Sequence, residues 1–270
     1  MIDKQQVTTA LFEQWDVIDA LLSELDEDRW RVSTPLPGWD VHAVVAHIVG
    51  TESLLHGEPL PSVDADVRAR AHVKNEIAAM NEQWVESLRP LTGAQLLERY
   101  RTITAQRRTD LAAMTDEAWY TPAMSPIGEV PYGRFMRVRL FDCWMHELDL
   151  RDALDLPGDE GNTRSRLAFQ DIVDPLPRVF AKRGKAPDGS RIAVELTGPL
   201  AQTLHIAVDG RAALVEAFDG PATTTIRMPS GLFARLAGGR TEVDAHRDAI
   251  EIDGDVEVGT RIVDNLAFVF

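Results

Sequence analysis

The sequence predicts an α+β protein in which an up-down four-helix bundle precedes a small α/β domain. Apolar residues recur at helical spacing through the first half of the chain. The second half contains short alternating runs that end in turn residues, as antiparallel strands do. We therefore expect one domain over residues 1–157 and another over residues 158–270. Of the 270 residues, 44% are hydrophobic, which suffices for a substantial core.

Five helices are expected in the first domain, over about residues 7–25, 40–57, 64–88, 93–114 and 132–154. The prolines and the glycine of "STPLPGWD" separate the first two. Asp40 is the expected N-cap of the second helix, and Trp39 and Val44 flank it as a hydrophobic staple. The inward residues of the third helix are expected to be Val67, Ile77, Trp84 and Leu88. A long connection, residues 115–131, leads to the last helix.

The second domain is expected to be built from strands with two short helices. The runs "RIAVELTG", "TLHIAVDG", "AALVEAFDG", "TTTIRM" and "AIEIDGD" predict strands. "SGLFARLAGG" predicts a short helix that Ser230 caps and glycines end. "VEVGTRIVDNLAF" predicts a final helix, and residues 156–190 predict part helix and part linker.

Composition excludes several classes of function. The formal charge is −15, whereas binding to nucleic acid or anionic membranes requires basic patches. No window approaches the roughly 18 apolar residues of a membrane span, and the N-terminal residues lack the apolar core of a signal peptide. The single cysteine, Cys143, excludes an internal disulfide and a CxxC metal site. These features favour a protein of the reducing cytoplasm.

The stretch "RLFDCWMHELDLRD", residues 139–152, carries an unusual set of polar residues for an apolar helix. Steps of three, four and three place Arg139, Asp142, His146 and Asp149 on one helix face. Asp142 and His146 are four residues apart, so both side chains can reach one metal ion. In a bundle the third ligand comes from a facing helix.

Of the seven histidines, His47 is the best candidate for that third ligand, because it lies mid-helix in the apolar run "VVAHIVG". Two imidazoles and one carboxylate suit a divalent first-row metal ion with an open coordination position.

Each of these residues also has an ordinary structural interpretation. A mid-helix histidine such as His47 is more often a hydrogen-bonded packing residue, and a D-x-x-x-H pair is common by chance. Arg139 and Asp149 could form a salt-bridged surface. Cys143 is expected to be a small buried hydrophobe, with a weaker alternative as a ligand because it lies three residues before His146.

Two segments in this order resemble the DinB-like, mycothiol-dependent maleylpyruvate isomerase family. "LPGWDVHAVVAHIVGTESLL" is similar to the family's first motif, with Trp39, Asp40 and His47 at its defining positions. "RVRLFDCWMHELDLRDAL" is similar to the second motif, R-x-x-E-x-x-x-H-x-x-D, through Arg139, Asp142, His146 and Asp149. This resemblance covers about residues 5–155. The tail from "TTTIRM" onward resembles the small sterol-carrier-like α/β domain of the same family.

The resemblance implies a metal ion, usually zinc, held by His47, Asp142 and His146. It also implies a low-molecular-weight thiol, mycothiol, on the open metal position, where its pKa falls and the thiolate attacks a small electrophile. Asp142 departs from the family, which usually has the longer Glu, and this leaves the identity of the metal open. Relatives include thiol S-transferases, so the substrate is not determined.

Two arginines are candidates for binding an anionic substrate or thiol at the mouth of the site. Arg139 lies on the site helix, and Arg240 could come from the second domain, although it could equally be an ordinary surface arginine. Together with Asp149, Arg139 is expected to act around the metal ion rather than on it. The leading function is a metal-dependent transferase or isomerase that uses a thiol. The alternatives are a non-catalytic metal or small-molecule binding protein and a metal-dependent hydrolase.

Overall fold

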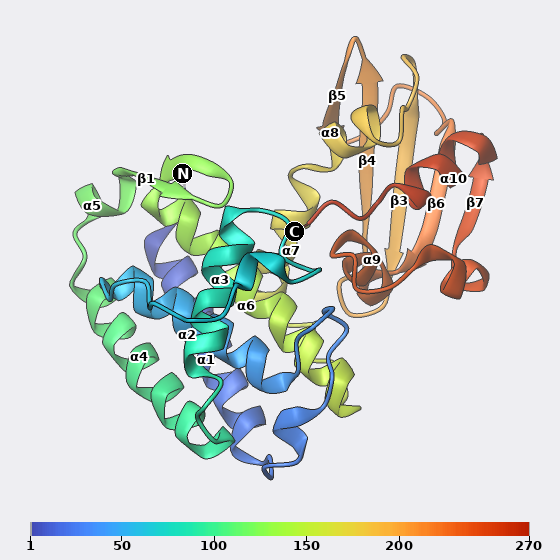
Figure 1. Ribbon diagram of the computed structural model, residues 1–270. Coiled ribbons are helices and arrows are strands. Elements are labelled where there is room, and N and C mark those ends of the chain that lie inside the picture. The colour runs from blue at the N-terminus through green and yellow to red at the C-terminus, as the bar shows by residue number, and fades with distance from the viewer. Residues whose placement is uncertain (1, 270) are drawn as a thin grey trace. The chain divides into compact units, whose positions relative to one another are not determined.

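The computed structural model describes residues 2–269, which divide into two compact units on either side of the boundary between Gly158 and Asp159. The first unit is helical and the second is built on a sheet (Figure 1), which confirms the α+β class.

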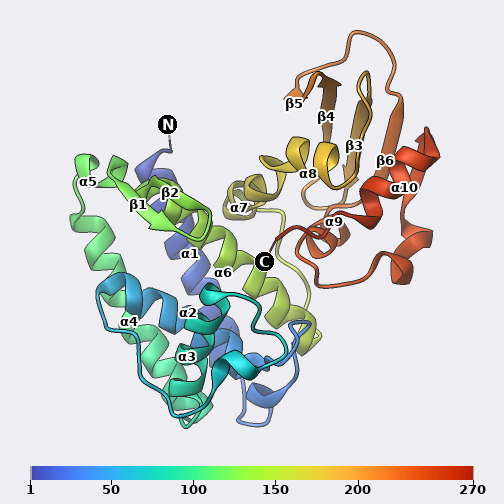
Figure 2. The same ribbon diagram turned by 45° about the horizontal axis from the view of Figure 1, so that its top comes forward.

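Within residues 2–158, four long helices form the expected bundle: α1 (Lys4–Ser23), α2 (Val41–His56), α4 (Gly93–Ala113) and α6 (Tyr132–Leu154). Smaller elements join them, namely η1 (Arg29–Arg31), η2 (Val67–Ala69), α3 (Glu76–Leu88), α5 (Asp116–Tyr120), β1 (Pro122–Ser125) and β2 (Gly128–Pro131). Figure 2 shows α3 beside α2, outside the bundle.

The bundle helices run in the order up, down, down, up, so the helices do not simply alternate in direction as an up-down bundle would. Helix α1 is antiparallel to α4, because Arg101 pairs with Asp19 and Arg108 pairs with Asp16. Helices α2 and α4 are parallel, because His42 at the start of α2 contacts the Leu91 carbonyl just before α4. Near the far ends of the same two helices, Arg107 binds Glu52. The opposite directions of α2 and α6 follow from contacts of His47 and Glu52 with later and earlier residues of α6, respectively. The long connection through α3 allows α4 to run in the same direction as α2.

Helix α2 lies at the centre of this unit. The Asp40 carboxylate accepts a hydrogen bond of 2.8 Å from the Ala43 amide, which confirms the predicted N-cap. The helix ends at Gly57, whose φ of 101° is in the left-handed region that favours glycine. Every residue from Val41 to Gly50 is buried, so neighbouring elements cover all sides of this part of α2.

Two predictions for the first unit are wrong. The third helix starts at Glu76 rather than near residue 64, because Asn75 caps it and the preceding chain is irregular. Ile77, expected inward, is 42% exposed, whereas Trp84 is buried as predicted. No helix or strand was identified from the sequence in the connection over residues 115–131. This connection contains α5 and the antiparallel hairpin of β1 and β2.

In residues 159–269, one five-stranded sheet has the order β5-β4-β3-β6-β7. Its strands are β3 (Arg191–Thr197), β4 (Gln202–Asp209), β5 (Arg211–Val215), β6 (Thr224–Pro229) and β7 (Glu251–Gly254). Strands β3, β4 and β5 are antiparallel as predicted, whereas β6 pairs parallel to β3. The accompanying helices are α7 (Thr163–Val173), α8 (Leu176–Lys182), α9 (Ser230–Ala237), η3 (Val243–Ala249) and α10 (Val256–Asp264).

The predicted cap of α9 is wrong. The Ser230 hydroxyl accepts a hydrogen bond of 3.2 Å from the Leu200 amide, and the helix has no side-chain cap. Ser230 therefore ties α9 to the turn after β3. Among the described residues, no helix is both long enough and apolar enough to cross a membrane.

We predict that Gly50→Ala destabilises the first unit. A Cβ at this position would lie 2.4 Å from Trp84 Cβ and Cγ, so α2 and α3 would have to move apart. Such overpacking typically costs about 1–3 kcal/mol, while an exposed helical glycine replaced by alanine would gain about 1 kcal/mol. Urea unfolding followed by far-UV circular dichroism measures the sign. Thr51→Ala on the same helix is the control, and a more stable Gly50→Ala variant would contradict the close packing.

Candidate metal centre

The three predicted ligands meet between α2 and α6. His47 Nε2 lies 3.3 Å from Asp142 Oδ2, and His146 Nε2 lies 3.7 Å from Asp142 Oδ1. One ligand atom from each residue lies within 4.8 Å of the other two. Both imidazoles are buried, while the Asp142 side chain is 30% exposed. Two ring nitrogens and a carboxylate oxygen at this spacing form a donor set that fits a divalent metal ion.

Burial and nearby charges favour the protonation states in which His47 and Asp142 can bind a metal ion. Burial lowers the pKa of His47 against the opposing attraction of Asp142, which favours a neutral imidazole. Burial alone would raise the pKa of Asp142, but Arg139, His146 and His47 hold it well below its usual range. A neutral imidazole and an ionised carboxylate are the forms that bind metal ions.

Asp149 is completely buried and contacts His146 from behind. Its Oδ2 lies 3.0 Å from His146 Nδ1, on the side of the ring away from Asp142. A carboxylate at this position favours a proton on Nδ1 and leaves Nε2 as the lone-pair donor. Burial rules out the interpretation of Asp149 and Arg139 as a solvated ion-paired surface, since Arg139 is only 3% exposed.

Arg139 connects the ligand carboxylate to a second buried acid that the sequence analysis did not identify. Its Nη1 donates to Asp142 Oδ2 at 2.6 Å and its Nε donates to Glu52 Oε1 at 3.0 Å. The other oxygen of Glu52 accepts from Arg107 Nε at 3.1 Å. Glu52 is completely buried in an apolar helix, and a charged residue at such a position was the available signal.

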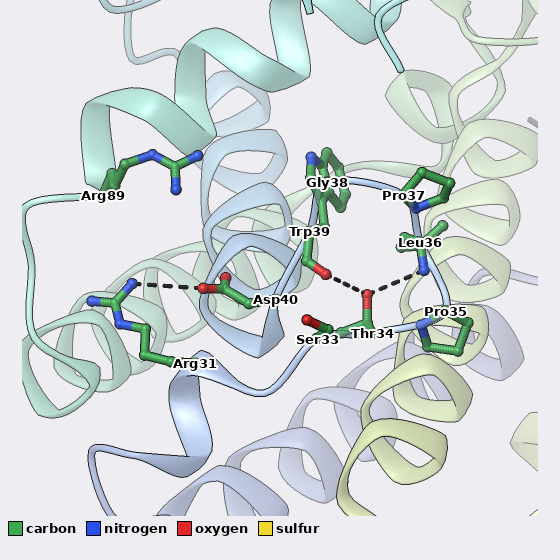
Figure 3. Close-up of a pocket in the computed structure, with 10 residues that line it drawn as sticks. All are labelled: Arg31, Ser33, Thr34, Pro35, Leu36, Pro37, Gly38, Trp39, Asp40 and Arg89. Carbon is green, nitrogen blue, oxygen red and sulfur yellow. Dashed lines mark hydrogen bonds and ion pairs between the residues drawn. The ribbon is translucent and has the colours of Figure 1, made fainter. Parts of the chain in front are cut away.

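Trp39 covers the two imidazoles. Its ring centroid lies 5.2 Å from that of His47 and 6.2 Å from that of His146. The same residue lines a surface pocket formed by the loop before α2 (Figure 3). The pocket is lined by Arg31, Ser33, Thr34, Pro35, Leu36, Pro37, Gly38, Trp39, Asp40 and Arg89. Thr34 braces this loop, because its Oγ donates to the Trp39 carbonyl and accepts from the Leu36 amide.

Arg240, the other predicted site arginine, belongs to the second unit. It follows α9, where its Nη1 donates to the Gly238 carbonyl at 2.6 Å. Its action at the metal centre stays a prediction.

Cys143 is completely buried beside the ligands, as expected for a small hydrophobic residue. Burial raises the pKa of its thiol to about 12, against the opposing effect of Arg139. Its Sγ lies 3.7 Å from Arg139 Nη2. The group of possible ligand atoms from His47, Asp142 and His146 does not include it. The thiol is therefore neutral at physiological pH and poorly suited to be a nucleophile.

We predict that Cys143 of the native protein resists alkylation. Iodoacetamide at pH 8 should modify it at least about 100-fold more slowly than in the urea-unfolded chain, because thiolate and access are both lacking. Mass spectrometry over time measures both rates. Native modification as fast as that of the unfolded chain would show that the thiol is accessible.

Comparisons with known proteins match both units of the chain. Residues 11–151 match the model of the mycothiol maleylpyruvate isomerase N-terminal domain, and residues 166–261 match the corresponding C-terminal domain. Two proteins of Mycobacterium tuberculosis, the uncharacterized proteins Rv0036c and MT0041, are each 28% identical over 212 residues, which is 75% of this chain and 77% of theirs.

A crystal structure of the mycothiol-dependent maleylpyruvate isomerase is similar at a TM-score of 0.60 and 17% identity, over 94% of this chain and 95% of that one. A mutant of that enzyme has the same TM-score at 15% identity. At these identities the likeness is one of fold. With both domain models matched in order, the chain belongs to the mycothiol maleylpyruvate isomerase family.

Proposed function

We propose that the protein is a metal-dependent enzyme that uses a low-molecular-weight thiol, mycothiol, to isomerise a small electrophile or to transfer the thiol to it. The observation that carries the proposal is the convergence of His47, Asp142 and His146, with Asp142 held ionised. Family membership supports the thiol, since the solved relatives of the same fold are described as mycothiol-dependent isomerases.

Zinc is the metal ion that this donor set fits best. Catalytic zinc sites commonly have three protein ligands from His and carboxylate side chains, and keep one position open. Asp142 reaches the two imidazoles despite being shorter than the usual glutamate, because both its oxygens face a ring nitrogen. A bound zinc ion would lower the pKa of a thiol at the open position and so supply a thiolate at neutral pH.

The residues of the chain would prepare the site for this chemistry. Asp149 holds the Nδ1 proton of His146, so that Nε2 is available as a ligand. Arg139 keeps Asp142 ionised and orients it with a short charge-assisted hydrogen bond. Cys143 is buried and its thiol pKa is raised to about 12, which makes it a poor nucleophile and supports a small external thiol in that role. Arg240 remains a candidate for contacting the substrate. A cytoplasmic location, with a small thiol and a small electrophile as partners, completes the proposal.

We predict that the protein binds about one zinc ion per chain. His47→Ala and His146→Ala should each lose most of it, because two remaining donors bind weakly. His56→Ala is the matched control, since His56 also lies on α2 but pairs with Asp110. Elemental analysis of protein purified without chelators measures the content. A metal-free wild type, or unchanged content in both ligand variants, would contradict the site.

We predict that turnover requires the thiol. A maleyl-type acid or an alkylating electrophile should be consumed only when mycothiol or a close analogue is present. Cys143→Ala should retain most of the activity, because the buried thiol is not the nucleophile. Metal-dependent turnover without a thiol would instead identify a hydrolase. Binding of metal and thiol without turnover of any electrophile would favour a binding protein.

A further inference from the structure

The two imidazoles of the candidate metal centre are held in different ways. His146 has a hydrogen-bonding partner for its outer nitrogen, since Nδ1 lies 3.0 Å from Asp149 Oδ2. His47 Nδ1 is buried and has no hydrogen-bond partner among the described residues. Metal-binding histidines almost always use their second nitrogen for a hydrogen bond that sets the orientation of the ring. No side chain or carbonyl of the described residues provides such a bond to His47 Nδ1.

Ring packing is the contact that remains for His47. Trp39 lies against it with a centroid distance of 5.2 Å and an interplanar angle of 36°. The His146 ring meets His47 edge-on, at 4.9 Å and 73°. The large indole thus limits rotation of the imidazole about its χ angles, provided that the indole itself is held in place.

A buried acid on α3 holds the indole. Trp39 Nε1 donates to Glu82 Oε2 at 2.9 Å, and Glu82 is completely buried. His72 Nε2 lies 3.0 Å from the same oxygen, and Arg70 pairs with the other one. A carboxylate fixed by several donors is a rigid acceptor for the indole N–H.

The backbone beside Trp39 is restrained as well. A Cβ on Gly38 would lie 2.5 Å from His72 Nδ1, so the loop and the His72 ring are closely packed. Helix α3 is in turn seated against α2, because Trp84 packs directly on Gly50, in the turn of α2 that follows His47. Indole, acid and imidazole therefore belong to one packed assembly.

We infer that Trp39, anchored by Glu82, is a positioning residue for His47 and takes the place of the hydrogen-bonded partner that Asp149 provides for His146. This rests on the proposed metal site. Helix α3 then acts as a support for the metal centre, although it contributes no ligand. Loss of the anchor should weaken metal binding to the extent seen on removing a hydrogen-bonded partner of a ligand, about 10- to 100-fold.

The experiment compares matched variants of α3 in the full-length protein. Glu82→Met removes the acceptor of the indole. Glu86→Met removes a carboxylate of the same helix that also pairs with Arg70 but does not contact Trp39. Zinc affinity is measured by competition with a chelator, and the stability of the metal-free proteins by urea unfolding. The d–d absorption of Co²⁺ in the site reports the ligand geometry.

We expect Glu82→Met and Trp39→Phe each to weaken zinc binding by about tenfold or more and to change the Co²⁺ spectrum. Asp149→Asn should have a comparable effect, as the reference for a lost hydrogen-bonded partner. Glu86→Met should stay within about twofold of wild type. Adding Glu82→Met to Trp39→Phe should cost nothing further, because phenylalanine has no N–H to anchor.

The inference would be overturned if Glu82→Met and Glu86→Met lost zinc affinity equally and in proportion to their loss of stability. It would also be overturned if Trp39→Phe kept the zinc affinity and the Co²⁺ spectrum of the wild type. Zinc binding by the wild type would leave the proposed function standing in either case. If Glu82→Met does not fold, the comparison of Trp39→Phe with Asp149→Asn still tests the inference. A wild type that binds no zinc would overturn both the inference and the proposed function.

Discussion

Charges of alternating sign, buried except for the partly exposed Asp142, run through the helical unit, and the register of three bundle helices depends on them. Asp142 and Arg139 on α6 are followed by Glu52 on α2 and Arg107 on α4, each within hydrogen-bonding distance of the next. Removing one member of such a set leaves an unpaired buried charge, which typically costs about 3–5 kcal/mol. The alignment that satisfies these charges also brings the His47 turn of α2 opposite the ligand turn of α6.

The same charges determine what the site can do. Arg139, His146 and His47 together hold the pKa of Asp142 well below its usual range although burial opposes them, so the carboxylate is ionised. Burial raises the pKa of Cys143 too, and for this thiol on the same helix turn the opposing effect of Arg139 is too small to prevent it, so the thiol stays neutral. The neighbours of Asp142 and of Cys143, rather than their distance from the candidate metal centre, therefore decide which of the two side chains is ionised.

Local patterns in the sequence were sufficient for the main helices and for the antiparallel pairing of β3, β4 and β5, but not for the parallel pairing of β6 with β3. Helix α6 spans the expected residues, and Asp40 caps α2 as its position before an apolar run indicates. The irregular chain before α3 was misjudged, because Val67 is buried in a 3₁₀ turn instead of on a helix face. The hairpin of β1 and β2 was missed, since each of these four-residue strands contains a proline, which is uncommon within strands.

The sequence by itself determined that Asp142, His146 and Asp149 share one face, because the helical repeat alone places residues three and four apart together. It also supported His47 as the third ligand, through the apolar run around it. Only the tertiary structure showed that Glu52 accepts a hydrogen bond from Arg139, that Glu82 accepts one from Trp39, and that the Trp39 ring lies against the imidazoles. These contacts join separate segments, and the packing of one helix against another sets them, which the periodicity of a single helix does not encode.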